Sequence, residues 1–141
     1  MMKRALVVLT SLAAISGGAL VAAPAASAAG HGCAGNQINV YPVTERNTGA
    51  VISNIFLYYD ASTGKNCASN VRTAAGGAGT AARISVSIWA DGGSAVTDDG
   101  NYAQYAGPVA TYARGKCINV KGVTYASGGR YGSVQRSGHC G

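Results

Sequence analysis

The sequence predicts an all-β protein, a small antiparallel β-sandwich or barrel stapled by two disulfide bonds, after an N-terminal signal peptide. Three observations favour this fold class. Segments rich in Val, Ile and Tyr alternate at short spacing with Gly, Ser, Asn and Asp clusters, which is typical of strands and turns. Residues 83–90 alternate between apolar and polar side chains. Four cysteines lie in the part of the chain that we expect to be exported.

The N-terminus has the composition of a secretory signal peptide over residues 1–28. A short basic start precedes an apolar, alanine-rich run, and Ala-Ser-Ala at 26–28 fits the A-x-A cleavage rule. The alternative is a retained membrane anchor, because the apolar run is nearly long enough to span a bilayer. Gly, Ser and Thr interrupt the run, however. We therefore expect one secreted domain over 29–141 and no integral membrane segment after cleavage.

The first three strands are expected before residue 74. Residues 37–44 alternate until Pro42, whose missing N–H favours the edge of a sheet. Residues 51–60 form the most apolar candidate strand, and the turn residues at 61–66 allow 67–73 to return as the second arm of a hairpin.

Residues 74–80 are expected to form a mobile connection. They contain too much Gly for a stable helix, since each Gly costs about 1 kcal/mol relative to Ala.

The clearest strand pattern is RISVSIWA at 83–90. Side chains of a strand alternate across the pleat, so one face is apolar and carries Ile84, Val86 and Ile88. The other face is polar and carries Arg83, Ser85, Ser87 and Trp89, the only tryptophan of the chain.

Short strands and turns are expected in the remainder of the chain. Turn residues at 91–94 and a polar break at 98–100 precede a predicted strand at 101–106. Gly107-Pro108 is expected to interrupt the chain before a strand at 109–113.

The last predicted strand follows a turn at 114–116. Residues 117–125 alternate again, and a Gly- and Ser-rich tail from Gly128 is expected to be anchored by Cys140. The count of about seven strands favours a sandwich or small barrel.

The even number of cysteines predicts two disulfides. Three pairings are open, and sequence proximity favours Cys33 with Cys67 and Cys117 with Cys140. Loops of these lengths would contribute about 3 to 4 kcal/mol each in the chain-entropy model. A four-cysteine zinc site is the alternative, but the sequence has no C-x-x-C pair. We expect no metal and no cofactor.

The mature chain is expected to be mildly basic. Without Lys3 and Arg4, nine of the 11 Lys and Arg residues remain against five Asp and Glu. The nine are scattered singly, which is typical of a solvated surface rather than of a nucleic-acid arm: Arg46, Lys65, Arg72, Arg83, Arg114, Lys116, Lys121, Arg130 and Arg136. We expect no specific nucleic acid as a partner. Outside a cell, a basic balance favours contact with acidic polymers, which include wall polymers, membranes and released nucleic acid. The oligomeric state stays open.

Catalysis is not expected. The two histidines of the predicted domain lie near its ends, at His31 and His139, and no Ser-His-Asp signature is present. Asp60 with Asp98 or Asp99 is the forced choice for a glycosidase pair, but turns also recruit Asp for backbone hydrogen bonds. The sequence therefore predicts that the protein is not an enzyme.

Binding is the more informative hypothesis. Trp89 on one face with Arg83, Ser85 and Ser87, joined by tyrosines of a neighbouring strand, would form a flat aromatic platform for sugar rings or wall polymers. Tyr105 completes the candidate binding residues. The alternative is that both faces of the sheet are buried and Trp89 fills the second.

Four segments resemble the spore-associated protein A family, small secreted proteins of filamentous bacteria. They are IFLYYDASTGKNC, DDGNYAQYAGPV, GKCINVKG and a terminal HC. The similarity runs from Cys33 to Cys140, includes all four cysteines, and is most specific in Tyr-Ala-Gly-Pro-Val at 105–109. The resemblance implies an exported protein associated with spores or aerial growth, and it provides no catalytic residues.

The sequence and the resemblance together predict a secreted protein at the extracellular or spore surface. We expect it to act without catalysis, by adhesion or structural association. One alternative is a carbohydrate- or cell-wall-binding module with its aromatic platform at Trp89. A second is a secreted protease inhibitor, whose reactive loop would be Arg114-Gly115-Lys116 beside Cys117.

Overall fold

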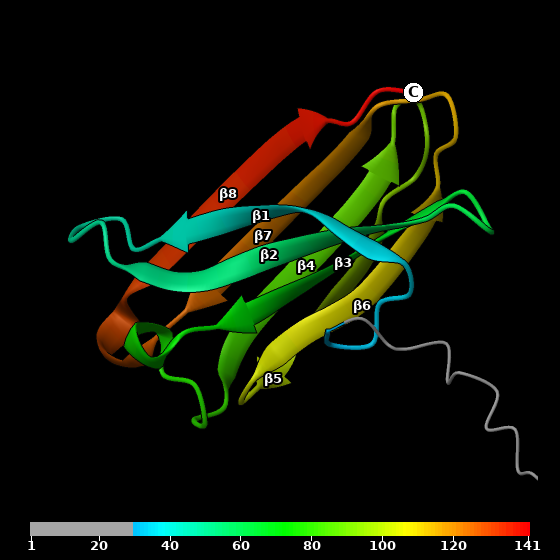
Figure 1. Ribbon diagram of the computed structural model, residues 1–141. Helices are drawn as coiled ribbons and strands as arrows, with labels where there is room; N and C mark the ends of the chain where they lie inside the picture. Colours follow the sequence, from blue (N-terminus) through cyan, green and yellow to red (C-terminus); the bar gives the residue numbers. More distant parts are fainter. Residues whose placement is uncertain (1–29) are drawn as a thin grey trace, which may run out of the picture.

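The computed structural model describes residues 30–141 as eight strands in two four-stranded sheets (Figure 1). The sheets pack on each other as a β-sandwich, so the predicted all-β fold class is confirmed. The signal peptide predicted over 1–28 lies outside the described residues.

All strand pairs within the two sheets are antiparallel. The first sheet has the order β1 (Asn36–Thr44), β2 (Val51–Asp60), β3 (Lys65–Arg72) and β6 (Tyr105–Tyr112). The second sheet has the order β5 (Val96–Tyr102), β4 (Ala82–Ala90), β7 (Ile118–Tyr125) and β8 (Tyr131–Gly138).

The first half of the chain follows the sequence prediction closely. β1 contains Pro42 and is the outermost strand of its sheet, as its missing N–H requires. The strand predicted at 51–60 is β2, and it pairs with β3 as the predicted hairpin. The chain then leaves the first sheet through 74–80, which contain the short 3₁₀ helix η1 (Ala74–Gly76) rather than an irregular connection throughout.

The polar break predicted at 98–100 is wrong, because β5 runs through it. Each carboxylate in this edge strand has a partner that compensates for its polarity. Asp99 accepts hydrogen bonds from Arg83. Asp98 accepts hydrogen bonds from the hydroxyl of Tyr102 at 2.7 Å and from the backbone N–H of Gly107 at 2.8 Å.

The predicted interruption at Gly107-Pro108 is also wrong, because β6 is continuous. The pairing register with β3 shifts between Ala68 and Asn70, so one extra residue of β6 is accommodated as a β-bulge. Gly107 has a positive φ of 105°, and a Cβ there would lie 2.8 Å from the carbonyl oxygen of Ala68. The turn signal in the sequence therefore marks a bulge inside a strand.

The Gly- and Ser-rich tail contains a strand that the sequence did not predict. β8 pairs with β7 from Ile118 opposite Gly138 to Tyr125 opposite Tyr131. The short 3₁₀ helix η2 (Ser127–Gly129) connects the two strands. The described residues therefore form eight strands rather than about seven.

The hydrophobic core lies between the two sheets. Its largest side chains are at most 1% exposed and include Ile52, Ile55 and Leu57 of β2 and Ile84, Val86 and Ile88 of β4. The alternation predicted for 83–90 is thus confirmed on its apolar face. Burial of each such side chain contributes about 1.5 to 3 kcal/mol.

A small polar network crosses this core. Nδ2 of Asn70 donates to the carbonyl oxygen of Ser85 at 3.0 Å and to Oγ1 of Thr124 at 3.1 Å. The hydroxyls of Thr124 and Ser53 share a hydrogen bond of 2.7 Å. Gly122 makes room for the network, because a Cβ there would lie 3.0 Å from Nδ2 of Asn70. These directional bonds fix how the two sheets sit on each other.

Both disulfides form with the pairing that sequence proximity favoured. Cys33 is bonded to Cys67, and this bond encloses β1 and β2. Cys117 is bonded to Cys140, and this bond encloses β7 and β8. Neither bond joins one sheet to the other, so the sandwich itself is held by non-covalent contacts.

Within residues 30–141, no helix combines the length and the apolar composition needed to cross a membrane.

Candidate functional site

Four of the five candidate binding residues lie along β4 on the side of the second sheet that faces away from the core. We call this side the outer face. Arg83 is exposed on it, whereas Ser85, Ser87 and Trp89 are half-buried. Trp89 therefore does not occupy a second buried core.

The structure places Tyr105 on a different surface. It lies in β6 of the first sheet and is 38% exposed. Its ring centroid is 5.3 Å from that of His31, which in turn lies 5.6 Å from the ring of Phe56. Tyr105 therefore belongs to the region where the N-terminal segment covers the first sheet, not to the outer face.

Hydrogen-bonding side chains surround Trp89 on the outer face. In the register of the sheet, Trp89 lies opposite Asn119 of β7, which lies opposite Ser137 of β8. The next row along the strands carries hydroxyl, amine and amide groups: Thr97, Ser87, Lys121 and Gln135. Ser87 and Thr97 share a hydrogen bond of 2.8 Å. This end of the outer face is a flat surface of one large aromatic ring and small polar groups.

The opposite end of the outer face carries a ladder of two arginines and two tyrosines. Arg83 lies over the ring of Tyr125 at 5.7 Å, and Tyr125 is stacked on Tyr131 at 5.5 Å. Arg46 lies over Tyr131 at 5.9 Å and donates a hydrogen bond to its hydroxyl. Each tyrosine ring thus has a neighbour on both sides. These are the tyrosines of neighbouring strands that the platform hypothesis invoked, but they lie at the far end of the face from Trp89.

The ladder continues into an ion pair. Nε and Nη2 of Arg83 donate to the two carboxylate oxygens of Asp99 at 3.1 and 2.9 Å. These hydrogen bonds hold the pKa of Asp99 below its usual value, and they raise the pKa of Arg83. Because the two side chains are 58% and 37% exposed, solvent screening limits the strength of the pair.

A buried arginine lies directly beneath the ladder. Arg72, which the sequence analysis grouped with the solvated surface cations, is only 5% exposed. Burial lowers its pKa. Its guanidinium donates to five backbone carbonyl oxygens over distances from 2.6 to 3.3 Å: those of Gly76, Ala82, Arg83, Tyr102 and Tyr125. One side chain thereby ties β3 to η1, β4, β5 and β7.

We call this end of the sandwich the clamped end. It contains Arg72 and the ladder of Arg46, Tyr131, Tyr125 and Arg83. In Figure 1 it lies on the left, with η1 and the β1–β2 turn.

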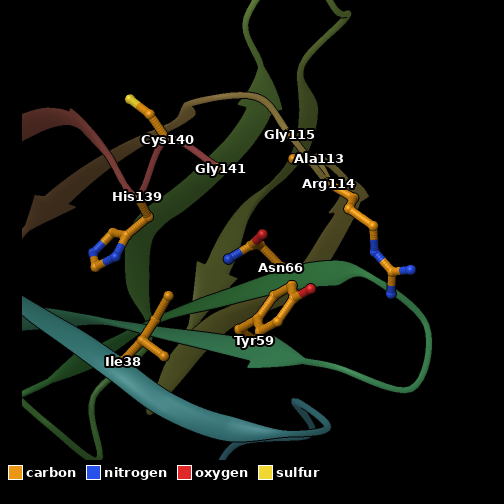
Figure 2. A pocket seen from close by; sticks show the side chains of 9 residues that line it. All are labelled: Ile38, Tyr59, Asn66, Ala113, Arg114, Gly115, His139, Cys140 and Gly141. Carbon is orange, nitrogen blue, oxygen red and sulfur yellow. The ribbon is translucent and has the colours of Figure 1, made fainter.

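The other end of the sandwich, which we call the open end, has Trp89 on its outer face and a hollow of about 320 Å³ at its mouth (Figure 2). Trp89 is followed by Ala90, which lies opposite Ile118. Cys117 precedes Ile118 and is bonded to Cys140, one of the residues that line the hollow. Arg114 of the turn considered for protease inhibition also lines it, with Nη2 donating to the carbonyl oxygen of Ala61 at 3.1 Å.

The carboxylates considered for catalysis are engaged in local structure. Asp60 accepts hydrogen bonds from the backbone N–H and hydroxyl of Ser62, which hold its pKa below the usual value. Asp98 is bonded to Tyr102 and Gly107, as described above. Within the described part of the chain, no three His, Cys, Asp or Glu side chains are grouped so that they could hold a metal ion.

Comparison with known proteins identifies a relative. The chain is 35% identical over 119 residues to spore-associated protein A of Streptomyces coelicolor, and the alignment covers 82% of this chain and 76% of the relative. No protein-family model matches the chain, and no solved structure matches it.

Proposed function

Since the chain belongs to the spore-associated protein A family, we propose that it is a secreted, non-catalytic protein that adheres to a polymer of the spore or cell surface. The name of the relative supports an association with spores. Two disulfides support an extracellular location, because such bonds persist in oxidising compartments. The adhesive surface in this proposal is the outer face around Trp89.

The observation that carries the proposal is the position of Trp89, which is half-buried on the outer face and stacks on no other ring in the described part of the chain. Among residues 30–141, the aromatic and cation–π contacts involve His31, Phe56, Tyr105 and the ladder, and none of them involves Trp89. A half-buried aromatic ring is rigid, and its uncovered part can pack against the C–H face of a sugar ring. All three rings are half-buried, but Tyr125 and Tyr131 contact another ring and an arginine, whereas the exposed part of Trp89 has no such neighbour among the described residues.

The surroundings of Trp89 favour a hydroxyl-rich polymer. Ser87, Thr97 and Gln135 can exchange hydrogen bonds with sugar hydroxyls. Lys121 is a cation between these polar groups, so the binding should depend only modestly on salt.

The proposal is tested by co-sedimentation of the purified, disulfide-bonded protein with cell wall, chitin and intact spores. We expect the protein to sediment with at least one of these polymers at moderate salt. The variant Trp89→Ala should bind about tenfold more weakly, which corresponds to about 1.4 kcal/mol. Tyr112→Ala is the matched control, because Tyr112 is a 58% exposed aromatic residue on the other sheet.

Three outcomes would contradict this function. Absence of binding to every polymer would remove adhesion as the activity. Binding that fades with salt equally in the wild type and Trp89→Ala would assign it to scattered cations. Equal losses in Trp89→Ala and Tyr112→Ala would show that the effect is not specific to the outer face. Circular dichroism of both variants checks that they are folded.

A further inference from the structure

The hollow at the open end is lined by side chains from distant parts of the sequence (Figure 2). They come from β1, β2, β3, the turn after β6 and the C-terminal segment. Those that carry the argument are Ile38, Tyr59, Asn66, Arg114, His139 and Cys140. No Asp or Glu side chain is among the residues of its wall. Its arginine only donates hydrogen bonds, whereas its amide, phenol and imidazole groups can donate and accept, so the hollow suits a ligand with acceptor oxygens and hydroxyl groups.

Arg114 supplies the positive charge of the hollow. One of its five N–H groups is used on the carbonyl oxygen of Ala61. The ion pair that the structure records among residues 30–141 joins Arg83 to Asp99, so Arg114 has no carboxylate partner in this part of the chain. A guanidinium fits a carboxylate through two parallel hydrogen bonds. Arg114 is therefore free to bind an anionic group.

Asn66 supplies a buried amide. The residue is only 4% exposed, and Figure 2 shows its side chain directed into the hollow, near the ring of Tyr59. Buried amides normally have hydrogen-bond partners. An amide that faces an open space of about 320 Å³ can take its partners from a ligand. Asn66 and Tyr59 together offer donors and acceptors of the kind that recognise hydroxyl groups.

His139 forms another part of the wall and is held in a fixed position. Its backbone has a φ of 51°, in the left-handed region that is costly for a residue with a Cβ. Nε2 of His139 lies 3.2 Å from Nδ2 of Asn39, whose Oδ1 accepts from the backbone N–H of Val40. This contact holds the imidazole ring against β1.

We propose that this hollow binds a sugar residue that carries a carboxylate, such as a uronic acid. Arg114 would pair with the carboxylate. The side chains of Asn66, Tyr59 and His139 would bond the hydroxyls. Ile38 and Cys140 give the hollow an apolar wall for the carbon skeleton of the ring. The site is separate from the outer face, so this proposal goes beyond the proposed function and does not depend on it.

The test is a titration of the ¹⁵N-labelled, disulfide-bonded protein with glucuronate, followed by NMR. We expect glucuronate to shift the amide signals of Asn66, Gly115 and His139 in a saturable manner. Glucose, which lacks the carboxylate, should bind about tenfold more weakly. Glucose 6-phosphate distinguishes a carboxylate site from a general anion site and should also bind more weakly than glucuronate.

Variants locate the binding. Arg114→Gln should weaken glucuronate binding about tenfold, and Arg136→Gln should leave it unchanged. Arg136 is a matched control because it is exposed and also donates to a backbone carbonyl oxygen, that of Gln135. His139→Asn keeps a residue that tolerates positive φ and provides a second variant should Arg114→Gln be unstable. It should weaken binding by about threefold, as the loss of one neutral hydrogen bond does.

Several results would overturn the proposal. They are the absence of saturable shifts at the solubility limit of glucuronate, equal or tighter binding of glucose 6-phosphate, and unchanged binding in a folded Arg114→Gln or His139→Asn. None of these results bears on sedimentation through Trp89, so the two proposals fail independently.

Discussion

The two ends of the sandwich use the same kinds of side chain in opposite ways. At the clamped end, the guanidinium of Arg72 donates to five carbonyl oxygens. The rings of Tyr125 and Tyr131 each contact the other ring and an arginine. At the open end, Trp89 has no recorded stacking partner and Arg114 has no carboxylate partner among the described residues. Arginine and aromatic residues therefore stabilise one end and are available for recognition at the other.

The difference shows that residue type alone does not identify a binding site. A group whose hydrogen bonds and contacts are already satisfied must lose them before it can gain others, so it contributes little net free energy to binding. A group that is positioned but unpaired gains interactions when a ligand arrives. Variants at the clamped end should consequently reduce stability, and variants at the open end should reduce binding.

The largest effect is expected from Arg72→Met. Methionine keeps much of the packing of the side chain but leaves five backbone carbonyl oxygens without the donors that Arg72 supplies. We expect the free energy of unfolding to fall by about 3 to 5 kcal/mol, as when a buried hydrogen-bond network is broken. Denaturant unfolding measures this loss.

Arg136→Met is the control for Arg72→Met, and its effect should stay within about 0.5 kcal/mol, because Arg136 is exposed. If the two variants unfolded at the same denaturant concentration, Arg72 would not clamp this end. Folded Arg72→Met should still bind the polymer. That result would show that Arg72 contributes to stability and not to binding.

A smaller effect is expected from Tyr131→Ala, which removes one stacked ring and the contact with Arg46. A stacked pair and an exposed cation–π contact together contribute about 1 to 2 kcal/mol. Thermal unfolding should show this loss, with no change in sedimentation with the polymer. Reduced sedimentation in folded Tyr131→Ala would mean that the ladder is itself part of the binding surface.

The smallest effect is expected from acid. Hydrogen bonds from Arg83 hold the pKa of Asp99 below 3.8, its usual value. The folded state therefore favours the ionised form of Asp99. The ion pair stabilises the protein at pH values above the usual pKa, and this stabilisation is lost as the pH falls toward the lowered pKa. Asp99→Asn should be slightly less stable than the wild type at pH 7.

Urea unfolding at a series of pH values tests the role of Asp99. The difference between the wild type and Asp99→Asn should shrink below about pH 4, because protonated Asp99 no longer pairs with Arg83. A difference that stays constant down to acid pH would exclude the ion pair as its cause.

Much of the fold could be predicted because its strands carry local signals. Residues 83–90 show the period of two that a sheet with one buried face imposes, and the cysteine spacing indicated the disulfides. β8 carries little such signal. Its eight residues include two Gly and two Ser, and they become a strand through pairing with β7, a contact that sequence composition does not report.

The errors at 98–100 and Gly107-Pro108 have one common cause. Both segments contain residues that favour turns, and tertiary contacts overrode that preference. Asp98 accepts the backbone N–H of Gly107 at the bulge, so the two segments stabilise each other where the edges of the two sheets meet. Both segments do contain turn-forming residues. In the structure, however, Gly107-Pro108 forms a bulge and residues 98–100 lie in an edge strand.

The candidate site could be predicted only in part. The alternation of β4 placed Trp89, Arg83, Ser85 and Ser87 on one face, because a strand determines this locally. The hollow forms where distant segments of the chain meet, and no local sequence pattern predicts such a meeting. Its residues include Tyr59, Asn66, Arg114 and His139. The burial of Arg72 could not be predicted either. Its partners are backbone carbonyl oxygens, and the sequence holds no acidic residue that would indicate them.

The positions of the disulfides also determine how the molecule would respond to mechanical load. Cys33 and Cys140 lie near the two ends of the described chain and are bonded to Cys67 and Cys117. A pull on these ends would pass through the sulfur bridges and reach only the segment from Cys67 to Cys117. β1, β2, β7 and β8 lie inside the closed loops and would carry no tension along their backbones. A protein held at a surface by one end could therefore stretch only through its middle strands, while half of its sheets remained shielded from the force.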